Sequence, residues 1–228
     1  MKNILREKPT QDLHGRLLES VNFLSDADLI GKDILDIGCG YGWFELNILN
    51  RGVDKIVGIE LSEENLETAK NNIKDKKISF GIGSAIDLPF GSESFDTVVA
   101  WEVIEHIPKG TEDLMFREIK RVLKDGGVLY LSTPCSSILS KIADPAWWLI
   151  GHRHYSQEKI RKLAQRNNFK EVEMKIKGRW WTIINILNMY FSKWILRRPP
   201  LFRNFFGRKI DEEYQKSGFV SAFVKFQK

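Results

Sequence analysis

Apolar residues follow two different spacings along the chain from residue 31 onward. Five short apolar runs predict buried strands, and they read DILDIG, KIVGIE, ISFGIG, FDTVVAW and GVLYLST. Between these runs, apolar residues recur every three or four positions over residues 42–52, 62–75 and 111–124, which predicts helices. We also expect a short helix after the segment LPFGS. Strands that alternate with helices in this way are typical of a parallel sheet with crossover helices.

The two ends of the chain extend this pattern. Residues 1–30 precede the first strand, and we expect a lead-in helix there, over residues 10–29. After the fifth strand, a loop leads to a helix that opens at Ser156, a good N-cap residue. Two consecutive strands, KEVEMKIK and GFVSAFVKFQ, then predict an antiparallel hairpin that closes one edge of the sheet.

The composition is that of a soluble globular protein, with 43% hydrophobic and 29% charged residues among 228 positions. This length suits one sizeable domain with an insertion. The first 15 residues carry no sustained apolar stretch, so we expect neither a signal peptide nor an anchor there. Cys39 and Cys135 lie far apart and form no CxxC motif, which fits a reducing, cytoplasmic environment.

Charge is distributed unevenly along the chain, although the net charge is only +5. Residues 1–150 carry a formal charge of −7, and residues 151–228 carry +12. A basic C-terminal part points to an anionic partner, such as phosphates, lipid headgroups or nucleic acid. The alternative interpretation is a well-solvated basic surface without a specific partner.

The segment ILDIGCGYG joins the first expected strand to the following helix, and it contains three alternating glycines. Gly38, Gly40 and Gly42 permit a positive φ and let the backbone approach a ligand closely. Doubly wound proteins bind nucleotide-like ligands at such turns, at the carboxyl edge of the sheet. A single turn of this kind also occurs in ordinary strand–helix connections, so the other motifs have to show whether this turn binds a ligand.

Four segments in sequence order carry a family resemblance: ILDIGCGYG, VGIELS, GSAIDLPFGSESFDTVVAWEVIEHI and LKDGGVLYLSTP. Together they resemble the class I S-adenosylmethionine-dependent methyltransferases, in particular the branch of ubiquinone-biosynthesis O-methyltransferases and related small-molecule enzymes. The resemblance covers about residues 30–170. It implies one α/β domain over residues 1–228. The expected fold is a doubly wound, Rossmann-like, seven-stranded, mostly parallel sheet with an antiparallel edge hairpin and a helical insertion at residues 178–217.

The resemblance implies S-adenosylmethionine as the cofactor and assigns residues to it. Asp36 would accept hydrogen bonds from the ligand's ammonium, directly or through water. Glu60, at the end of the second strand, would bind both ribose hydroxyls, as the corresponding acid does in dinucleotide-binding proteins. The expected cofactor-binding residues are Asp36, Gly38, Cys39, Gly40, Glu60, Leu61, Ser84, Ala85 and Trp101.

Ser84 departs from the family pattern. Members commonly have an aspartate at this position, and that acid accepts a hydrogen bond from the adenine amino group. A serine can still accept this bond, but a neutral acceptor makes a weaker one. Ala85 would contact the adenine through its backbone N–H, and Trp101 would line the cofactor cleft. Asp87 could replace the missing acid, but we favour a role for it in the turn before Pro89.

The segment WEVIEHI follows the fourth strand, where the methyl group would face the acceptor. Glu102, Glu105 and His106 can share one face if this turn is helical. His106 could be the general base that deprotonates an acceptor hydroxyl. The three residues could instead hold a divalent ion. They could also simply organise the loop, which we favour, so we assign no metal ligand and keep His106 as a candidate catalytic residue.

His152 and His154 precede Ser156 in the segment GHRHYS. This segment resembles a block that borders the substrate entrance in relatives. Two histidines at this spacing are a weak metal signal on their own. We therefore include His152 and His154 with His106 as candidate catalytic residues, facing the acceptor.

The insertion between the two hairpin strands is the most individual part of the chain. From Trp180 to Leu196, the polar residues Thr182, Asn185, Asn188 and Ser192 form a narrow stripe on an otherwise apolar helix. Its 17 residues extend about 25 Å, which is short of a membrane span. The segment LFRNFFGRK then mixes aromatic and basic residues, which suits an anionic membrane surface. A lid without membrane contact and a homodimer contact are the alternatives.

Three functional hypotheses follow from these observations. The leading one is an S-adenosylmethionine-dependent methyltransferase that acts on a small, lipophilic or glycosylated acceptor, at oxygen. The second is a nucleic-acid methyltransferase that uses the basic C-terminal part, but no Asn/Asp-Pro-Pro-Tyr type of motif follows the fourth strand. The third is a module that binds the cofactor without catalysis. We expect a cytoplasmic protein with a small-molecule acceptor and peripheral contact at the inner membrane face.

Overall fold

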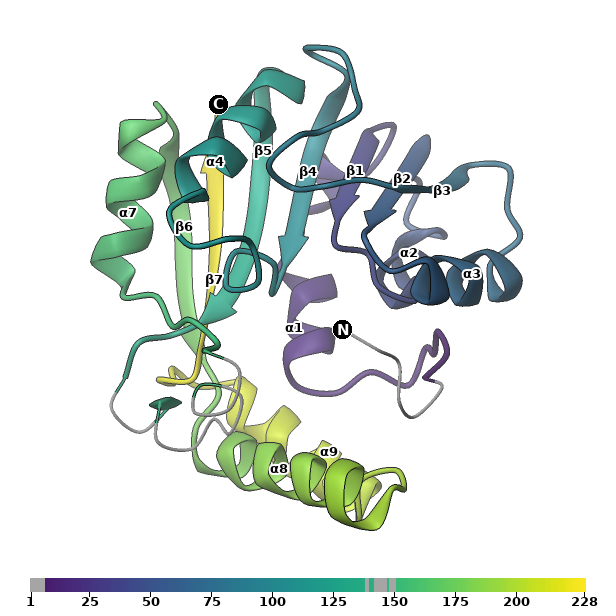
Figure 1. Cartoon of the computed structure of the whole chain (residues 1–228), viewed down its shortest axis with the longest axis vertical. Helices are drawn as coiled ribbons and strands as arrows, with labels where there is room; N and C mark the ends of the chain where they lie inside the picture. Colours follow the sequence, from purple (N-terminus) through teal and green to yellow (C-terminus); the bar gives the residue numbers. More distant parts are fainter. Residues whose placement is uncertain (1–6, 138–139, 142–146, 148–150) are drawn as a thin grey trace.

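Seven strands form one sheet in the computed structural model, which describes residues 7–137, 140–141, 147 and 151–228. The spatial order is β3-β2-β1-β4-β5-β7-β6 (Figure 1). The strands are β1 (Asp33–Ile37), β2 (Lys55–Glu60), β3 (Ile78–Ile82), β4 (Phe95–Trp101), β5 (Leu123–Pro134), β6 (Lys170–Lys177) and β7 (Ser221–Gln227). Neighbours among the first five strands pair in parallel, whereas β7 is antiparallel to both β5 and β6. The expected fold class and its edge hairpin are confirmed.

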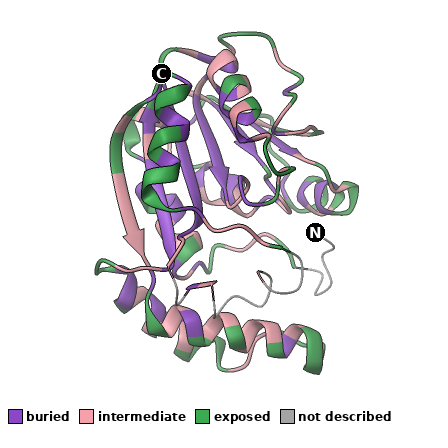
Figure 2. Ribbon diagram, turned by 60° about the vertical axis from the view of Figure 1, so that its left-hand side comes forward, coloured by how far each residue is buried: buried purple, intermediate pink, exposed green. Residues whose placement is uncertain are grey.

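Helices cover both faces of the sheet, which explains why the central strands are continuous apolar runs. One buried cluster joins the sheet to α4 and α7, and the other joins it to α1, α2 and the end of α9 (Arg203–Tyr214). The strands between these layers are buried (purple in Figure 2). The described residues outside the insertion include the helices α1 (Arg16–Phe23), α2 (Trp43–Ile48), α3 (Glu63–Asn72), α4 (Glu112–Val122) and α7 (Gln157–Arg166).

Two serines cap helices as the sequence predicts. The Ser62 hydroxyl accepts a hydrogen bond from the backbone N–H of Asn65 at 3.3 Å, at the start of α3. The Ser156 hydroxyl accepts one from the N–H of Lys159 at 3.1 Å, at the start of α7. Each serine satisfies one of the N–H groups that a helix start leaves without an intrahelical partner.

The lead-in helix is shorter than expected. Within the described residues of this segment, α1 covers only Arg16–Phe23, and a single 3-10 turn follows at Asp26–Asp28. Gly15 precedes the helix with a φ of 56°, and its N–H donates to the Asp211 carboxylate at 2.7 Å. The start of this helix therefore depends on a contact with Asp211, near the other end of the chain. No local sequence pattern shows this contact.

The prediction of a short helix after LPFGS is wrong. Residues 91–94 form turns, and β4 begins directly after them. The N–H groups of Glu93 and Ser94 donate to the carbonyls of Arg121 and Val122, at 2.9 and 2.8 Å. These bonds tie the segment to the end of α4 and take the donors that a helix would use internally.

The insertion forms a pair of helices rather than the single helix that the sequence predicts. The helix α8 (Trp180–Tyr190) continues as a π-helix (Phe191–Leu196), and a second helix, α9 (Arg203–Tyr214), runs back beside it (Figure 1). The Glu213 carboxylate of α9 accepts hydrogen bonds from the N–H of Trp181 at 2.8 Å and of Thr182 at 3.1 Å. This acid therefore caps the start of α8 and holds the two helices together. No helix in the described ranges is both long and apolar enough to cross a membrane.

Candidate active site

The glycine turn after β1 is shaped by two different requirements. Gly38 has a φ of 75°, and a Cβ at this position would lie 2.7 Å from the Cγ2 of Val103. Only glycine lets the turn approach the segment after β4 so closely. Gly40 has a φ of 56°, and a Cβ there would meet no atom within 4 Å. The backbone at Gly40 therefore borders open space, as a turn that receives a ligand requires.

Glu60 connects the ends of β1 and β2. Its carboxylate accepts hydrogen bonds from the N–H groups of Gly40 at 3.2 Å, Leu61 at 2.7 Å and Ser62 at 3.0 Å. These bonds hold the glycine turn against the turn after β2. The Leu61 side chain is 70% exposed beside it, at the carboxyl edge of the sheet. The structure thus brings the expected residues of the first two motifs together.

Asp36 has a buried acidic neighbour that we did not single out from the sequence, Glu45 in α2. Both side chains are almost fully buried, and neither Asp36 Oδ1 nor the two Glu45 carboxyl oxygens accept a hydrogen bond from an N–H or hydroxyl group of the described residues. Burial, then the charge of Glu45 and a hydrogen bond with it, raise the pKa of Asp36 well above its usual value. Burial raises the pKa of Glu45 to about 8. We conclude that Glu45 keeps its proton near neutral pH, beside Asp36.

The packing around Glu45 shows that the fold makes room for its carboxyl group. A Cβ on Gly58 of β2 would lie 2.5 Å from Glu45 Oε1, so glycine at this strand position makes room for the acid. Glu45 also lies on the apolar side of α2, between the buried Phe44 and Ile48. Cys39, which we expected beside the cofactor, is buried against this pair, and burial followed by the nearby acids raises the pKa of its thiol.

The turn after β3 has the form that the sequence predicts for Asp87. The Asp87 N–H donates to the Ser84 carbonyl at 3.2 Å, and the Asp87 side chain is exposed. The Ser84 hydroxyl accepts a bond from the Ile86 N–H at 3.4 Å, and Ala85 is buried. The geometry therefore fits a turn role for Asp87. Asp87 therefore does not lie at the position of Ser84, where relatives commonly have an aspartate.

The segment after β4 is not helical, so Glu102 does not share a helix face with Glu105 and His106. Glu102 has a φ of 55°, and its carboxylate accepts hydrogen bonds from Arg16 at 2.6 Å and from the Ser132 hydroxyl at 2.9 Å. Trp101, just before it, is buried with its indole N–H unpaired among the described residues. The arrangement of Glu102, Glu105 and His106 on one helix face does not occur, because the backbone turns at Glu102.

A different trio assembles in its place. The donor atoms of Glu105, His106 and His152 lie within 4.8 Å of one another. The rings of His106 and His152 are 4.8 Å apart, and Nε2 of His152 lies 3.9 Å from Oε1 of Glu105. Glu105 is buried, and Thr133 donates to its other oxygen at 3.0 Å. His106 and His152, two of the three candidate histidines, therefore lie beside the buried carboxyl group of Glu105. The sequence does not show this grouping.

Burial and neighbouring charges shift the pKa values of His106 and Glu105 in this cluster. The surrounding protein and the neighbouring His152 lower the pKa of His106 to about 4, although part of its side chain reaches solvent. Burial, and then the charge of Glu102, raise the pKa of Glu105 well above its usual value. A neutral imidazole can accept a proton, and three such donor atoms could also hold a divalent ion. His154 is not part of this trio, and its ring centre lies 6.0 Å from that of His152.

Arg153, between the two histidines, fixes the loop that carries His106. Its guanidinium donates to the carbonyls of Ile104 at 2.7 Å and of Glu105 at 3.2 Å, and also to the Ile107 carbonyl. A fourth bond, at 3.0 Å, goes to the carboxylate of Glu112. Arg153 is thus a positioning residue that the sequence alone did not indicate.

Arg153→Met should lower the free energy of unfolding by about 3 kcal/mol, because it leaves several partly buried acceptors without a donor. Arg161→Met is the matched control, since Arg161 forms an exposed ion pair with Glu171 at 2.9 Å. That change should cost less than about 1 kcal/mol. Urea unfolding of both variants measures the difference, and equal losses would show that Arg153 does not hold the loop.

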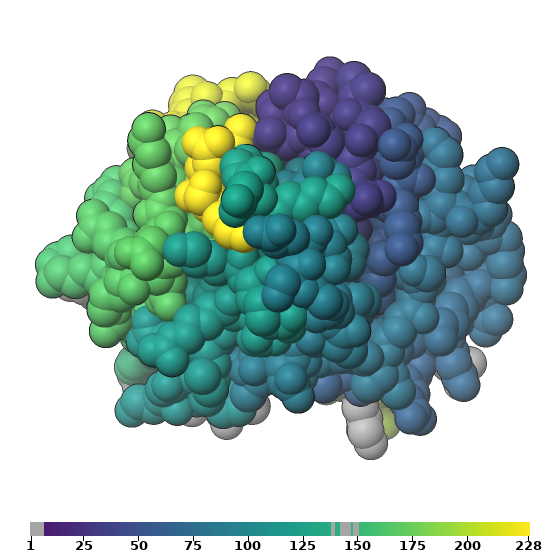
Figure 3. Space-filling view, turned by 90° about the horizontal axis from the view of Figure 1, so that it is seen from above, coloured from purple at the N-terminus to yellow at the C-terminus, as the bar shows by residue number. Residues whose placement is uncertain are grey.

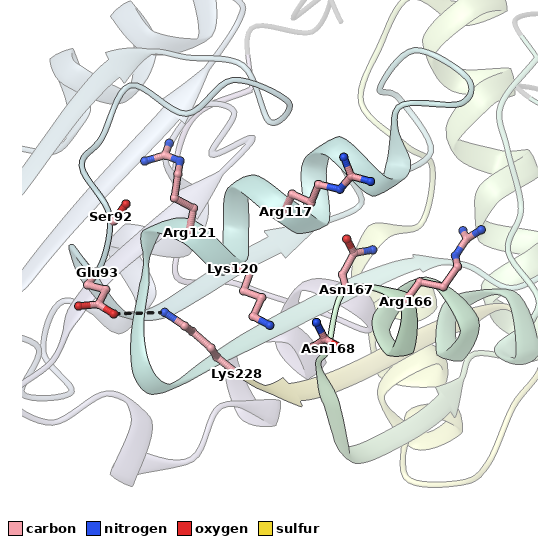
Figure 4. A pocket seen from close by; sticks show the side chains of 9 residues that line it. All are labelled: Ser92, Glu93, Arg117, Lys120, Arg121, Arg166, Asn167, Asn168 and Lys228. Atoms are coloured by element: carbon pink, nitrogen blue, oxygen red, sulfur yellow. Dashed lines mark ion pairs between the residues drawn. The ribbon is translucent and has the colours of Figure 1, made fainter.

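One surface hollow lies far from this cluster. A hollow of about 520 Å³ is lined by Ser92, Glu93, Arg117, Lys120, Arg121, Arg166, Asn167, Asn168 and Lys228 (Figure 4). It lies near the C-terminus, at the amino ends of the parallel strands; Figure 3 looks onto this end, with the last residues in yellow. Several of its basic groups are paired, such as Arg121 with Glu118 at 2.7 Å and Lys228 with Glu93 at 3.7 Å. We therefore locate the candidate active site at the other end of the sheet.

Comparison with known sequences gives a consistent result. A sequence model described as a methyltransferase domain matches residues 10–174. The ubiquinone biosynthesis O-methyltransferase of Neisseria meningitidis is 34% identical over 113 residues, which are 47% of this chain and 46% of that protein. The erythromycin 3''-O-methyltransferase of Saccharopolyspora erythraea is 35% identical over 133 residues, 54% of this chain and 40% of that protein. The chain spans less than half the length of these curated relatives.

Solved structures show the same fold at low sequence identity. An S-adenosylmethionine-dependent methyltransferase from Mesorhizobium loti has a TM-score of 0.64 at 17% identity, covering 92% of this chain and 96% of that one. The cyclase SpnF has a TM-score of 0.73 at 20% identity, covering 99% of this chain and 91% of that one. The fold therefore hosts more than one kind of chemistry among its members.

Proposed function

The chain belongs to the methyltransferase-domain family, and on that premise we propose that it transfers a methyl group from S-adenosylmethionine to an oxygen of a small, lipophilic acceptor. The expectation of a methyltransferase that uses this cofactor is confirmed at the level of the family. The identity of the acceptor, the atom that is methylated and the roles of individual residues are our proposal.

One observation carries the proposal: the cofactor-type residues and the histidine cluster lie at the same edge of the sheet. Asp36 lies near the carboxyl end of β1, Glu60 is the last residue of β2, and His106 follows β4, which is next to β1. Ligands of doubly wound sheets bind at the carboxyl ends of the strands, where the strand order reverses. Here the order reverses between β1 and β4, so the glycine turn and the histidine cluster are on the two sides of that point.

The residues of the glycine turn fit S-adenosylmethionine. Asp36 Oδ1 is buried and unpaired within the described chain, so it can accept a hydrogen bond from the ligand's ammonium. The space at Gly40 leaves room for the methionine part, and the Glu60 carboxylate is a suitable acceptor for ribose hydroxyls. Ser84 and Ala85 would border the adenine. When bound, the cofactor supplies an electrophilic methyl group on a sulfonium sulfur.

The histidine cluster supplies the base that methylation at oxygen needs. A hydroxyl is a weak nucleophile, and removal of its proton as the new bond forms makes it stronger. His106 is neutral near pH 7, so a ring nitrogen can accept this proton. His152 and the buried Glu105 lie beside it and can orient the hydroxyl or take the proton onward, while His154 borders the entrance. Arg153 holds the loop in place.

The relatives support a small acceptor. Those named above are O-methyltransferases of ubiquinone biosynthesis and of erythromycin. Both names refer to methylation at oxygen of a small molecule, and this is the feature that we extend to the present chain. Nucleic-acid methylation is disfavoured, because the basic residues of the insertion alternate with exposed apolar ones. A module that only binds the cofactor is the remaining alternative.

Transfer of a labelled methyl group separates these hypotheses. The full chain is incubated with radiolabelled S-adenosylmethionine and either a cellular lipid extract, transfer RNA or no acceptor. We expect label in organic-soluble products only. Label in the RNA would support the second hypothesis, and cofactor binding without transfer to any fraction would support the third.

Glu60→Ala should weaken the binding of S-adenosylmethionine by about 1–3 kcal/mol, the range for hydrogen bonds to a charged group. Calorimetric titration measures the change. Glu60→Gln keeps an acceptor oxygen and should lose less, and Glu67→Ala removes an exposed acid of α3 and should lose nothing. Unchanged affinity in Glu60→Ala would remove this residue from the cofactor site.

A further inference from the structure

The outer face of the insertion exposes a row of large apolar side chains. Ile184, Leu187, Phe191, Trp194 and Ile195 are 41–69% exposed, and we refer to these five residues as the apolar stripe. They recur every three or four positions along α8 and the π-helix, so they lie on one side of a continuous helix. Apolar groups gathered in this way mark a surface that contacts a partner.

The opposite side of the same helix already has its partners. Asn188 donates to the Leu201 carbonyl at 2.8 Å, and the Ser192 hydroxyl accepts from the Leu201 N–H at 3.3 Å. Thr182 donates to the Glu213 carboxylate at 2.6 Å. The polar residues of this helix therefore bind α9 and the connecting loop. The structure turns them inward and leaves the apolar stripe outside.

Positive charge surrounds the apolar stripe. Residues 180–209 contain six Lys and Arg residues and no Asp or Glu. Arg197 and Arg198 are exposed directly after the π-helix, and Arg208 is exposed on α9. Arg203 reaches Asp12 only at 3.5 Å, across an exposed pair. The segment thus combines exposed aromatic and aliphatic groups with an excess of positive charge, in which Lys209 is paired with Glu212 at 3.0 Å.

We propose that the apolar stripe and its neighbouring arginines dock on the surface of an anionic lipid bilayer. Tryptophan and phenylalanine are favoured at the level of lipid headgroups, and arginine is attracted to anionic lipids. A second copy of the chain fits less well, because two basic surfaces would face each other. A helix with one apolar side and a basic surround lies in the interface and does not cross the membrane.

The insertion also sits on the side of the molecule that carries the candidate active site. Asp211 of α9 forms hydrogen bonds with His14 and Gly15, both at 2.7 Å. Arg16, the residue after Gly15, pairs with Glu102 after β4. Figures 1 and 2 show α8 and α9 beyond the carboxyl ends of the parallel strands. Docking would bring this edge toward the bilayer, where a lipophilic acceptor dissolves. This consequence rests on the proposed function, whereas docking itself does not.

Co-sedimentation tests the proposal with the full chain and no cofactor. Vesicles that contain phosphatidylglycerol are compared with pure phosphatidylcholine, at low salt and at about 1 M salt, where screening shortens to about 3 Å. We expect binding to the anionic vesicles at low salt, and strong loss of binding in high salt or on neutral lipid. Brominated lipids should quench tryptophan fluorescence, and Trp194→Phe should remove part of that quenching.

Two pairs of variants separate this surface from the rest of the molecule. Arg197→Glu with Arg198→Glu should weaken vesicle binding at least 25-fold, at about fivefold for each lost cation. Arg117→Glu with Lys120→Glu makes the same change in net charge at the opposite end of the sheet, and should have a much smaller effect. Phe191→Ser with Trp194→Ser should abolish quenching, whereas Ile30→Ser with Leu114→Ser, exposed elsewhere, should not.

Several outcomes would overturn the proposal. No binding to anionic vesicles at low salt would do so directly, whether or not the protein methylates a substrate. Equal losses in the two charge-reversal variants would show only nonspecific attraction by the net charge. Light scattering that shows a dimer, dissociated by Phe191→Ser with Trp194→Ser, would assign the apolar stripe to a second copy instead.

Discussion

His106→Ala should lower the turnover number about 100-fold to 10,000-fold, the usual contribution of a general base. Its affinity for S-adenosylmethionine should be unchanged, because His106 lies on the acceptor side of the site. The reason is geometric and electrostatic together: the imidazole is neutral near pH 7 and belongs to the cluster with His152 and Glu105. Steady-state rates with the acceptor found in the labelling experiment measure this loss.

Controls distinguish a base from the other two roles. Imidazole added to His106→Ala should restore part of the rate if the side chain accepts a proton. His154→Ala, at the entrance, should cost far less. A rate within about threefold of the wild type would reassign His106 to loop organisation. Loss of wild-type activity with a chelator, restored by Mg²⁺, would instead indicate a metal ion held by the cluster.

Glu45→Gln should remove part of a pH dependence of stability. The pKa of Glu45 is raised by burial to about 8, from an ordinary value of 4.5. A carboxyl group with a raised folded-state pKa stabilises the fold fully at low pH, and this contribution is lost as pH rises toward about 8. Each retained proton changes the free energy of unfolding by about 1.4 kcal/mol per pH unit. Asp36 acts in the same direction, because its pKa is raised as well.

Chemical denaturation between about pH 5 and about pH 8 tests this sign. Wild-type stability should fall relative to Glu45→Gln as pH rises, so the variant should be the more stable protein at about pH 8. Glutamine fills the same space as the protonated acid and can still donate to Asp36. Glu67→Gln, an exposed acid, is the control. Parallel pH profiles for wild type and Glu45→Gln would contradict a protonated Glu45 at neutral pH.

The sequence predicts the fold well because local patterns determine most of it. The central strands are largely buried apolar runs, whereas the edge strands β3 and β6 are partly exposed. Ser62 and Ser156 cap helices where capping residues are expected. The family resemblance is confirmed by the sequence model and by solved structures of the same fold. The wrong helix after LPFGS and the short α1 both reflect long-range hydrogen bonds that no local pattern contains.

The candidate site is predictable only in part, for the same reason. The glycine turn and Glu60 are recognisable from spacing, because the backbone there has to approach a ligand. Glu45 and Arg153 are not, since an acid in a helix and an arginine in a loop are usually exposed. The grouping of His106 with His152 joins residues 46 positions apart, so only the fold brings them together.

A crystal structure with S-adenosylhomocysteine bound tests the central claim most directly. The account predicts the ligand at the carboxyl edge of the sheet, with its amino-acid part at Asp36 and Gly40 and its ribose at Glu60. Its sulfur should face the side of His106 and His152. The ligand in the hollow lined by Arg117 and Lys120, or absent from the glycine turn at saturating concentration, would contradict the account.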